Sequence, residues 1–432
     1  MRKYLFHIVF GLLTLINLGC VEEIDLLTET EFQEALVIEA TITNELKQQV
    51  IKLSRTYPLE VSGPSPESNA TVKVVDGAGN AISFSESESG IYLSNQPFAA
   101  QPNIDYRLEI TTSNGKSYGS TTMQLTPQTP IGDLYVERGF NENEDEGVSI
   151  FVDTYDPSGN TNYYRFEYEE TYKIIAPDYS PLELNIQNDD FPYDNMNGEF
   201  LSQFLDANGL NLDELTDFFV TLDFRESQEQ ICYNSVKSNH ILVTSTTDLI
   251  EDQLSQYRVR FINRNNYIIS HRYSILVRQY IQSKEAHTFY KTLRDFSSEG
   301  NLFSQIQTGF LEGNVFSLSN NEELVVGFFE VSYVDEKRVY FNYADLFPGE
   351  SLPAYYINCD DYYRPILLRE DFVHNIIDSP LINALKGGWI FFQEVEDNSF
   401  SPFSYAPYEL VLEPCGDCTV LGQNVVPDFW ED

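Results

Sequence analysis

The sequence predicts a mainly β protein: an N-terminal immunoglobulin-like β-sandwich followed by a larger β-rich domain with short helical insertions. Three observations support this fold class. The 432 residues include 28 Tyr and 30 Phe but only 3 Met and 2 Trp, and aromatic residues are enriched in strands. Turn-forming residues are present throughout, with 23 Gly and 19 Pro. Short runs that alternate between apolar and polar residues recur along the chain, which is the pattern of half-buried strands.

Residues 1–19 are predicted to be a lipoprotein signal peptide. A short basic start precedes a mostly apolar run over 4–18, which has the length of a signal-peptide core. Because the run ends in a small residue followed by Cys20, we expect cleavage before Cys20 and acylation, including palmitate, of its thiol and amine. Asn17 stands where such signals usually carry Leu. The alternatives are an ordinary secretory signal with a chance cysteine and a short buried helix.

Residues 20–33 are predicted to be an acidic tether. Glu22, Glu23 and Asp25 closely follow the lipidated cysteine, and they resemble the export signal that sends lipoproteins of Bacteroidota to the cell surface. A solvated spacer is the alternative. Acyl chains anchor a protein stably without a spanning helix, and no later segment is long and apolar enough to be transmembrane. We therefore expect an outer-membrane protein, exposed at the cell surface, that reaches the lipid through Cys20.

Residues 34–126 are predicted to form the immunoglobulin-like sandwich. The pair Asn114-Gly115 between two strand-like runs is a strong hairpin signal, and 76–80 form a second turn. About seven short strands in about ninety residues is the size of such a domain. Six of these strands can be located in the sequence, at 35–42, 49–54, 70–75, 81–84, 106–110 and 117–120.

The segment 126–130 is the predicted linker, because its two prolines interrupt both helix and ladder hydrogen bonding. Residues 131–432 form the predicted β-rich domain, with an acidic loop at 142–146. Its predicted strands are 147–154, 163–172, 257–262, 267–282, 324–333 and 338–340.

Three helical insertions are predicted in this second domain. Residues 199–208 and 213–219 read as short helices around Gly209. The third helix spans 284–296, with Ser283 as its N-cap. Its apolar face consists of Ala286, Phe289, Tyr290, Leu293 and Phe296.

The end of the chain is unusually aromatic. Residues 427–432 contain Phe429 and Trp430 close to two cysteines. Because such side chains bury large areas, we expect the tail to dock on the second domain. The rival interpretation is a peptide that docks on a partner.

Four cysteines remain after processing, and an even number in an exported protein favours disulfides. The candidates are Cys232, Cys359, Cys415 and Cys418, whose three possible pairings stay open. Cys415 and Cys418 have the spacing of a redox or zinc half-site. The chain has no second pair with this spacing and no thioredoxin-like context. A structural role is therefore predicted, with no metal.

The charge balance narrows the choice of partners. Lys and Arg number 26 against 67 Asp and Glu, a formal net charge of −41. Such a chain repels phosphate backbones, so no nucleic-acid partner is expected. Charge-driven docking on an anionic membrane is equally disfavoured.

No catalytic motif is present. The sequence lacks a Gly-x-Ser-x-Gly elbow, a phosphate-binding P-loop, a dinucleotide fingerprint and a His-Glu-x-x-His helix. His240, His271, His287 and His374 are interpreted as structural. The sequence does not support a carboxylate pair for glycoside hydrolysis. With 67 acidic residues, some pair could be picked out by chance at almost any spacing. We predict a protein that is not an enzyme and has no catalytic residue or cofactor.

Several loops contain residues that could bind a ligand. Residues 153–160 could offer oxygens to calcium, but they lack the spacing of an EF-hand loop, so a β-turn held by Asp and Asn side chains is favoured. The pairs 189–190 and 360–361 are interpreted as solvated charges. Three tyrosine pairs are interpreted as packing residues, with a stacking platform for a sugar or peptide as the alternative: 163–164, 355–356 and 362–363.

Four stretches together resemble one family. The stretches are 37–44 with 52–56, 106–108 with 114–118, 313–315 with 326–329, and 415–419 with 427–430. In their order and spacing they are similar to the Bacteroidota outer-membrane lipoproteins of the domain-of-unknown-function family 4249. The resemblance implies an N-terminal sandwich, a β-rich second domain and the outer membrane. Genes of this family commonly lie beside TonB-dependent transporters, which implies an accessory role in nutrient import. The family defines no catalytic residue.

The predicted function is that of a non-enzymatic outer-membrane lipoprotein, an accessory substrate-binding or docking partner of a TonB-dependent transporter. Two alternatives remain. One is a structural or adhesive surface lipoprotein whose sandwich presents loops to other cells. The other is a hydrolase with an unrecognised carboxylate site.

Overall fold

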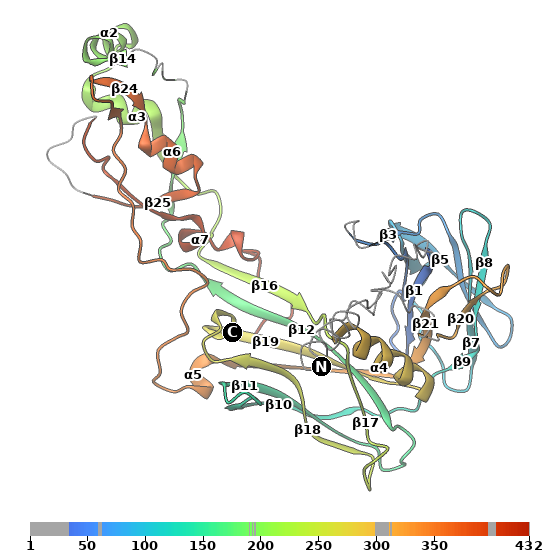
Figure 1. Cartoon of the computed structure of the whole chain (residues 1–432). Coiled ribbons are helices and arrows are strands. Elements are labelled where there is room, and N and C mark those ends of the chain that lie inside the picture. Colours follow the sequence, from blue (N-terminus) through green and yellow to red (C-terminus); the bar gives the residue numbers. More distant parts are fainter. Residues whose placement is uncertain are drawn as a thin grey trace, which may run out of the picture.

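The computed structural model describes residues 34–431, except 59–62, 190, 192, 194–195, 299–310, 312 and 396–402. The chain is mainly β, as the sequence predicts. Figure 1 shows three bodies: a first sheet at the right, a second body below the centre, and a long arm that projects to the upper left. Each body has its own buried apolar core.

The first body is an 11-stranded sheet that folds around one core. Its strands run in the order β20-β8-β7-β4-β5-β6-β2-β1-β21, with β3 beside β2 and β9 beside β7. The bounds are β1 (Leu36–Thr43), β2 (Val50–Arg55), β3 (Ser65–Pro66), β4 (Thr71–Asp76), β5 (Ala81–Glu88), β6 (Ile91–Ser94), β7 (Asp105–Thr111), β8 (Ser117–Ser120), β9 (Met123–Gln124), β20 (Val315–Ser317) and β21 (Val325–Ser332).

Two strands of the first body come from beyond the predicted boundary at residue 126. β21 pairs in parallel with β1 along its whole length, and β20 pairs with β8. Residues 34–126 therefore supply nine strands of this sheet, and residues 315–332 supply the other two. Local alternation predicts that a strand forms but does not say which distant strand it joins. The immunoglobulin-like identity of this body stays a prediction.

A pair of glycines explains how β21 fits against its neighbours. Gly327 has a φ of +143°, and a Cβ atom there would lie 2.1 Å from the carbonyl oxygen of Ile38. A Cβ atom on Gly313 would lie 1.8 Å from the carbonyl oxygen of Gly327. Beside them, the Asn314 side chain accepts from Phe329 N at 2.7 Å and donates to Phe329 O at 2.8 Å. A side chain at either position would collide with a neighbouring backbone carbonyl, so only glycine fits at 313 and 327.

The second body stacks two sheets on a shared core. One sheet has the order β10-β11-β18, and the other has the order β16-β12-β19-β22 with β17 beside β12. The strands are β10 (Ile131–Phe140), β11 (Glu146–Tyr155), β12 (Tyr163–Ile175), β16 (Ile231–Lys237), β17 (Leu242–Ser245), β18 (Gln253–Asn263), β19 (Arg272–Ile281) and β22 (Val334–Asn342). The predicted strand 267–282 is divided, because η3 (Tyr267–Ile269) precedes β19.

The arm is inserted between β12 and β16 and is completed by residues near the end of the chain. It contains three small sheets, β13-β15, β14-β24-β23 and β25-β26. Its strands are β13 (Leu182–Ile186), β14 (Met196–Asn197), β15 (Val220–Phe224), β23 (Arg369–Glu370), β24 (Asn375–Asp378), β25 (Trp389–Glu394) and β26 (Tyr408–Leu412). Its helical elements are α2 (Gly198–Asn208), η2 (Leu212–Glu214), α3 (Leu215–Phe219), α6 (Pro380–Lys386) and α7 (Glu413–Gly416), which η6 (Cys418–Val420) follows. The two predicted helices near Gly209 correspond to α2 and α3.

Two further helices belong to the second body. The predicted helix over 284–296 is α4 (Lys284–Ser298), and Ser283 Oγ accepts from Ala286 N at 3.1 Å at its start. The short α5 (Tyr343–Leu346) follows β22. α4 lies between the first and second bodies (Figure 1).

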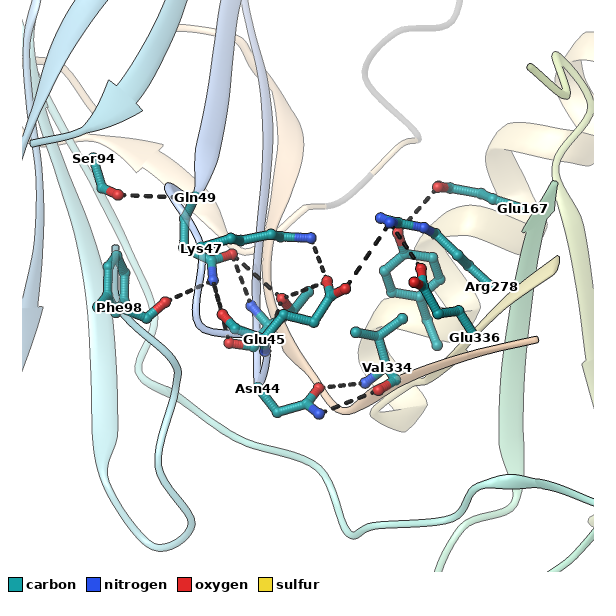
Figure 2. Close-up of polar contacts among 12 residues, drawn as sticks. Asn44, Glu45, Lys47, Gln49, Ser94, Phe98, Glu167, Arg278, Val334 and Glu336 are labelled. Carbon is teal, nitrogen blue, oxygen red and sulfur yellow. Dashed lines mark hydrogen bonds and ion pairs between the residues drawn. The ribbon is translucent and has the colours of Figure 1, made fainter. Parts of the chain in front are cut away.

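The turn between β1 and β2 rests on the second body (Figure 2). Asn44 Oδ1 accepts from Val334 N at 2.6 Å, and Asn44 Nδ2 donates to Val334 O at 3.2 Å. Arg278 lies 3.9 Å from Glu45 and 2.8 Å from Glu336. Polar contacts thereby fix the hairpin of β1 and β2 to β22, the edge strand of the five-stranded sheet in the second body.

A buried ion pair lies deeper in the same junction. Arg165 on β12 contacts Glu330 on β21 at 3.1 Å, with side chains that are 7% and 1% exposed. The guanidinium also lies over the rings of Tyr280 and Tyr290, at 4.0 and 4.7 Å from their centroids. Glu330 additionally accepts from Ser332 Oγ at 2.8 Å. The pair therefore joins the first sheet, the second body and α4.

Removing the acid of this pair is expected to destabilise the protein strongly. Glu330→Ala removes the buried carboxylate from the Arg165 guanidinium and leaves it only the partly exposed Glu167 as an ionic partner. The loss of a buried partner costs up to about 3–5 kcal/mol of unfolding free energy. Chemical denaturation followed by fluorescence measures the loss. Glu39→Ala is the matched control, because Glu39 and Lys52 form an exposed pair at 4.0 Å that contributes little. Equal effects of the two substitutions would contradict the assigned role.

Candidate functional site

A cleft of about 930 Å³ opens between α4 and the first sheet. This volume lies within the range of small-molecule sites, which favour domain interfaces. Its polar lining residues are Thr121, Thr122, Lys284, Glu285, Thr288, Thr292 and Asn314, and its apolar ones include Met123, Phe289, Leu311 and Phe328. The cleft is the best candidate for a ligand site in the described part of the chain.

The two walls of the cleft are positioned by different contacts. On the helix side, Phe289 packs against Phe328 of β21 with ring centroids 5.5 Å apart. On the sheet side, Asn314 O accepts from Thr121 N at 2.9 Å. The glycine and asparagine contacts on β21 thus also shape the floor of the cleft. No motif in the sequence predicts this site. Three of its lining residues, Gly313, Asn314 and Phe328, do belong to a stretch that resembles the family.

The lining chemistry suits binding through hydroxyl groups and apolar contact. Among the described residues that line the cleft, Glu285 is the one carboxylate and Lys284 the one amine. The closely spaced carboxylate pair of a glycosidase is therefore not assembled by these residues.

The four histidines that follow Cys20 in the sequence lie in four separate places. His287 on α4 is buried with its ring 5.0 Å from that of Tyr163, and burial followed by the charges of Lys291 and Arg294 lowers its pKa. His271 lies beside Lys173, and burial followed by this charge lowers the pKa of His271.

The other two histidines are exposed. His374 Nδ1 lies 3.1 Å from Glu370, in the turn after β23, and the ring of His240 contacts Asn239. No two of the four share a described site.

The loop at 153–160 is a turn held by its own carboxylate. Asp156 accepts from Ser158 N at 2.8 Å, from Asn160 N at 2.9 Å and from Thr161 N at 3.1 Å. Asp252 reaches the same place and accepts from Thr161 N at 3.2 Å and from Tyr164 Oη at 2.8 Å. The geometry agrees with the predicted β-turn.

The remaining acidic and aromatic candidates mostly make local contacts. Asp189 pairs with Lys386 at 2.7 Å, Asp190 lies outside the described residues, and Asp360 and Asp361 are exposed.

The tyrosine pairs pack on other rings or in the core. Tyr164 is buried in the second body. The ring partners are Tyr267 for Tyr355 and Tyr356, Phe392 for Tyr362, and Trp389 for Tyr363.

The four cysteines form two disulfides at the base of the arm. Cys232 on β16 is bonded to Cys418, and Cys359 is bonded to Cys415. The closely spaced pair Cys415 and Cys418 thus bonds to two different partners. In the described residues, the one group of three side chains that could hold a metal is Asp178 with Cys359 and Cys415. Both of its cysteines are already in a disulfide.

The aromatic tail docks on the second body, as expected. Arg338 lies 3.7 Å from the ring centroid of Phe429, and the Trp430 ring lies 4.8 Å from that of Tyr233. Tyr340 donates to the Phe429 carbonyl oxygen. These contacts favour a tail that docks on its own second domain, because the side chains that a docking peptide would offer to a partner are already packed.

The anchoring residues lie outside the described part of the chain. This applies to Cys20 and to the acidic residues Glu22, Glu23 and Asp25. Among the helices of the described residues, none has the length and apolar character needed to cross a membrane.

The 153–160 turn gives a pH-dependent prediction. Burial alone would raise the pKa of Asp156, but hydrogen bonds from Ser158, Asn160 and Thr161 outweigh it and hold the pKa below its ordinary value. A carboxyl with a depressed pKa stabilises the fold above its unfolded pKa of about 3.9, and this contribution is lost as the pH falls through the folded value.

Asp156→Asn is therefore expected to lower the unfolding free energy by about 1–3 kcal/mol at pH 7. The difference from the wild type should shrink as the pH falls below about 4. Urea denaturation at a series of pH values measures both effects. A difference that stays constant down to pH ~2 would contradict the role of the ionised carboxylate.

No curated protein matches the chain. A family model described as "Domain of unknown function (DUF4249)" matches residues 21–338. The match spans well over half of the chain, includes both cleft walls and ends within β22. The chain belongs to the DUF4249 family.

Proposed function

We propose that this protein is an accessory docking lipoprotein of a TonB-dependent transporter, anchored in the outer membrane through Cys20 and exposed at the cell surface. The observation that carries the proposal is the arm, a projecting body whose base is fixed by two disulfides. Such a body suits the presentation of a contact surface to a partner at a defined position.

The rigidity of the arm follows from how it joins the second body. β12 leads into the arm and β16 leads back, and these two strands pair over seven residues, from Glu169↔Lys237 to Ile175↔Ile231. Cys232 on β16 is bonded to Cys418 just after α7. Each disulfide removes conformational freedom from the base, and a native disulfide typically stabilises by about 2–4 kcal/mol.

The base is also fixed by charge. Arg225 Nε donates to the Ser180 carbonyl oxygen at 3.0 Å, and the same guanidinium pairs with Glu229. Asp417 lies 3.9 Å from it, between the two cysteines of the Cys-x-x-Cys stretch. The arm and its base therefore move as one unit in this proposal.

The cleft beside α4 extends the proposal from docking to substrate retention. Its volume and its mixture of hydroxyl and apolar groups suit a small polar molecule on its way to a transporter. The family resemblance supports the same assignment, because such genes commonly lie beside TonB-dependent transporters.

An adhesive role is the second candidate. Exposed apolar side chains on surface turns, such as Leu46 and Ile250, would suit contact with other cells. Deletion of the gene separates the two roles: loss of nutrient uptake supports the docking role, and loss of attachment with normal uptake supports adhesion.

The lipid anchor is tested by substitution of its cysteine. Cys20→Ala is expected to remove the protein from the outer-membrane fraction, because no acyl chain can then be attached. Fractionation and immunoblotting measure this. The companion variant, with Glu22, Glu23 and Asp25 replaced by Ala, should keep the lipid but lose protease accessibility on whole cells. Protein that stays in the outer membrane without a lipid would contradict the anchor.

The transporter partnership is tested by purification of the native complex. Tagged wild-type protein, extracted from outer membranes in mild detergent, is expected to bring down a β-barrel transporter that mass spectrometry identifies. The Cys20→Ala protein is the control, since it should not reach the transporter. Recovery of the tagged chain alone would count against the proposal.

A further inference from the structure

The far end of the arm carries a turn that exposes two large apolar side chains. Phe372 is 105% exposed and Val373 is 71% exposed. They lie between β23 and β24, and Figure 1 shows β24 at the end of the arm beside α2 and β14. Scattered exposed apolar residues are ordinary. Two adjacent ones at the end of a projecting body are the arrangement of a contact point.

The turn is held in one conformation by Asp371. Its Oδ1 accepts from Val373 N and from Asn375 N, each at 2.9 Å. Its Oδ2 accepts from Asn375 Nδ2 at 3.2 Å. The two apolar side chains are therefore displayed by a pre-organised turn, and pre-organisation reduces the entropy lost on binding.

Further apolar groups lie at the same end of the arm. Ile377 on β24 is 45% exposed and Phe200 at the start of α2 is 52% exposed. α2 directly follows β14, and β14 pairs with β24 through Met196↔Ile376. The turn thus stands beside additional apolar surface.

The charges around the turn select the kind of surface that can cover it. Arg369 pairs with Asp378 at 2.8 Å, so these two charges balance. Two more carboxylates lie beside them, Glu370, which contacts His374 Nδ1 at 3.1 Å, and Asp371, which holds the turn. The whole chain carries a net charge of −41. A second copy of this chain would bring the same acidic rim into contact with itself. An anionic lipid headgroup layer would likewise be repelled.

We infer that the Phe372–Val373 turn is an anchor that inserts into an apolar pocket, rimmed by Lys or Arg, on a protein partner. This inference rests on the proposed docking role and names its point of contact on this chain. Buried aromatic anchors dominate the binding energy of protein interfaces. The acidic residues beside the turn would meet the basic rim and favour the correct orientation.

The test places a photo-crosslinking residue at the turn of the full-length protein in cells. Phe372→p-benzoylphenylalanine is expected to give a light-dependent adduct with the transporter that is recovered with the wild-type chain. Peptide mapping of the adduct should locate it in an apolar pocket flanked by Lys or Arg. Ile250→p-benzoylphenylalanine is the matched control, because Ile250 is 103% exposed but lies in the second body.

Substitutions provide an independent measure. Phe372→Ser with Val373→Ser should reduce recovery of the transporter at least tenfold, whereas the thermal unfolding temperature should not change. Glu370→Lys should weaken recovery as well, because it reverses a charge of the acidic rim. Leu249→Ser with Ile250→Ser, an exposed apolar pair in the second body, should leave recovery unchanged.

Four outcomes would overturn the inference. One is adduct formation between two copies of this chain. Another is binding of the purified protein to phosphatidylglycerol-containing vesicles that the serine substitutions abolish. A third is a transporter complex that survives these substitutions without an adduct from residue 372, which leaves the proposed function intact. The last is the absence of any transporter complex, in which case the proposed function fails together with the inference.

Discussion

The contact between Arg165 and Glu330 joins parts of the chain that are far apart in sequence. Glu330 lies on β21, which completes the first sheet, and Arg165 lies on the central strand β12 of the second body. Both side chains are almost fully buried, so the loss of either one removes the main compensation for the other's charge. The rings of Tyr280 and Tyr290 cover the guanidinium. Tyr290 belongs to α4, so this contact links the helix to the ion pair. The pair therefore contributes to the position of α4, together with the packing of Phe289 on Phe328 that forms one wall of the cleft.

Some of the scarce cationic residues link separate parts of the structure. The chain has only 26 Lys and Arg, yet several arginines link separate elements. Arg260 contacts Glu170 at 3.0 Å between the two sheets of the second body. Arg225 pairs with Glu229 and binds the Ser180 carbonyl oxygen at the base of the arm. Arg suits this use, because its planar group can bond to several acceptors and stack on rings at once. The excess acidic charge is left for the surface, where water solvates it.

The molecule has two candidate functional regions, and the arm separates them. The cleft lies beside α4, between the first and second bodies. The Phe372–Val373 turn connects β23 and β24 near the far end of the arm. Two disulfides at the base of the arm connect these regions through the second body. In the proposed role, a contact made at the turn would fix the orientation of the cleft relative to the partner.

Local features of the fold were determined by the sequence itself. Alternating apolar residues predicted the main strands, and Asn114-Gly115 predicted the hairpin of β7 and β8, where Gly115 has a φ of +85°. The apolar face and the Ser283 cap predicted α4. These signals depend on neighbours within a few residues, so they can be recognised without knowledge of the fold. The number of cysteines likewise predicted disulfides, although their pairing stayed open.

Tertiary structure decided everything that joins distant segments. The parallel pairing of β1 with β21 links Leu36 to Val325, and no local periodicity specifies such a partner. The choice of Cys232 for Cys418 depended on how the arm folds back onto β16. The cleft also arose in this way, because its two walls come from α4 and from strands on both sides of it in sequence. A site formed where separate bodies meet has no motif of its own, and only the packing of those bodies brings its residues together.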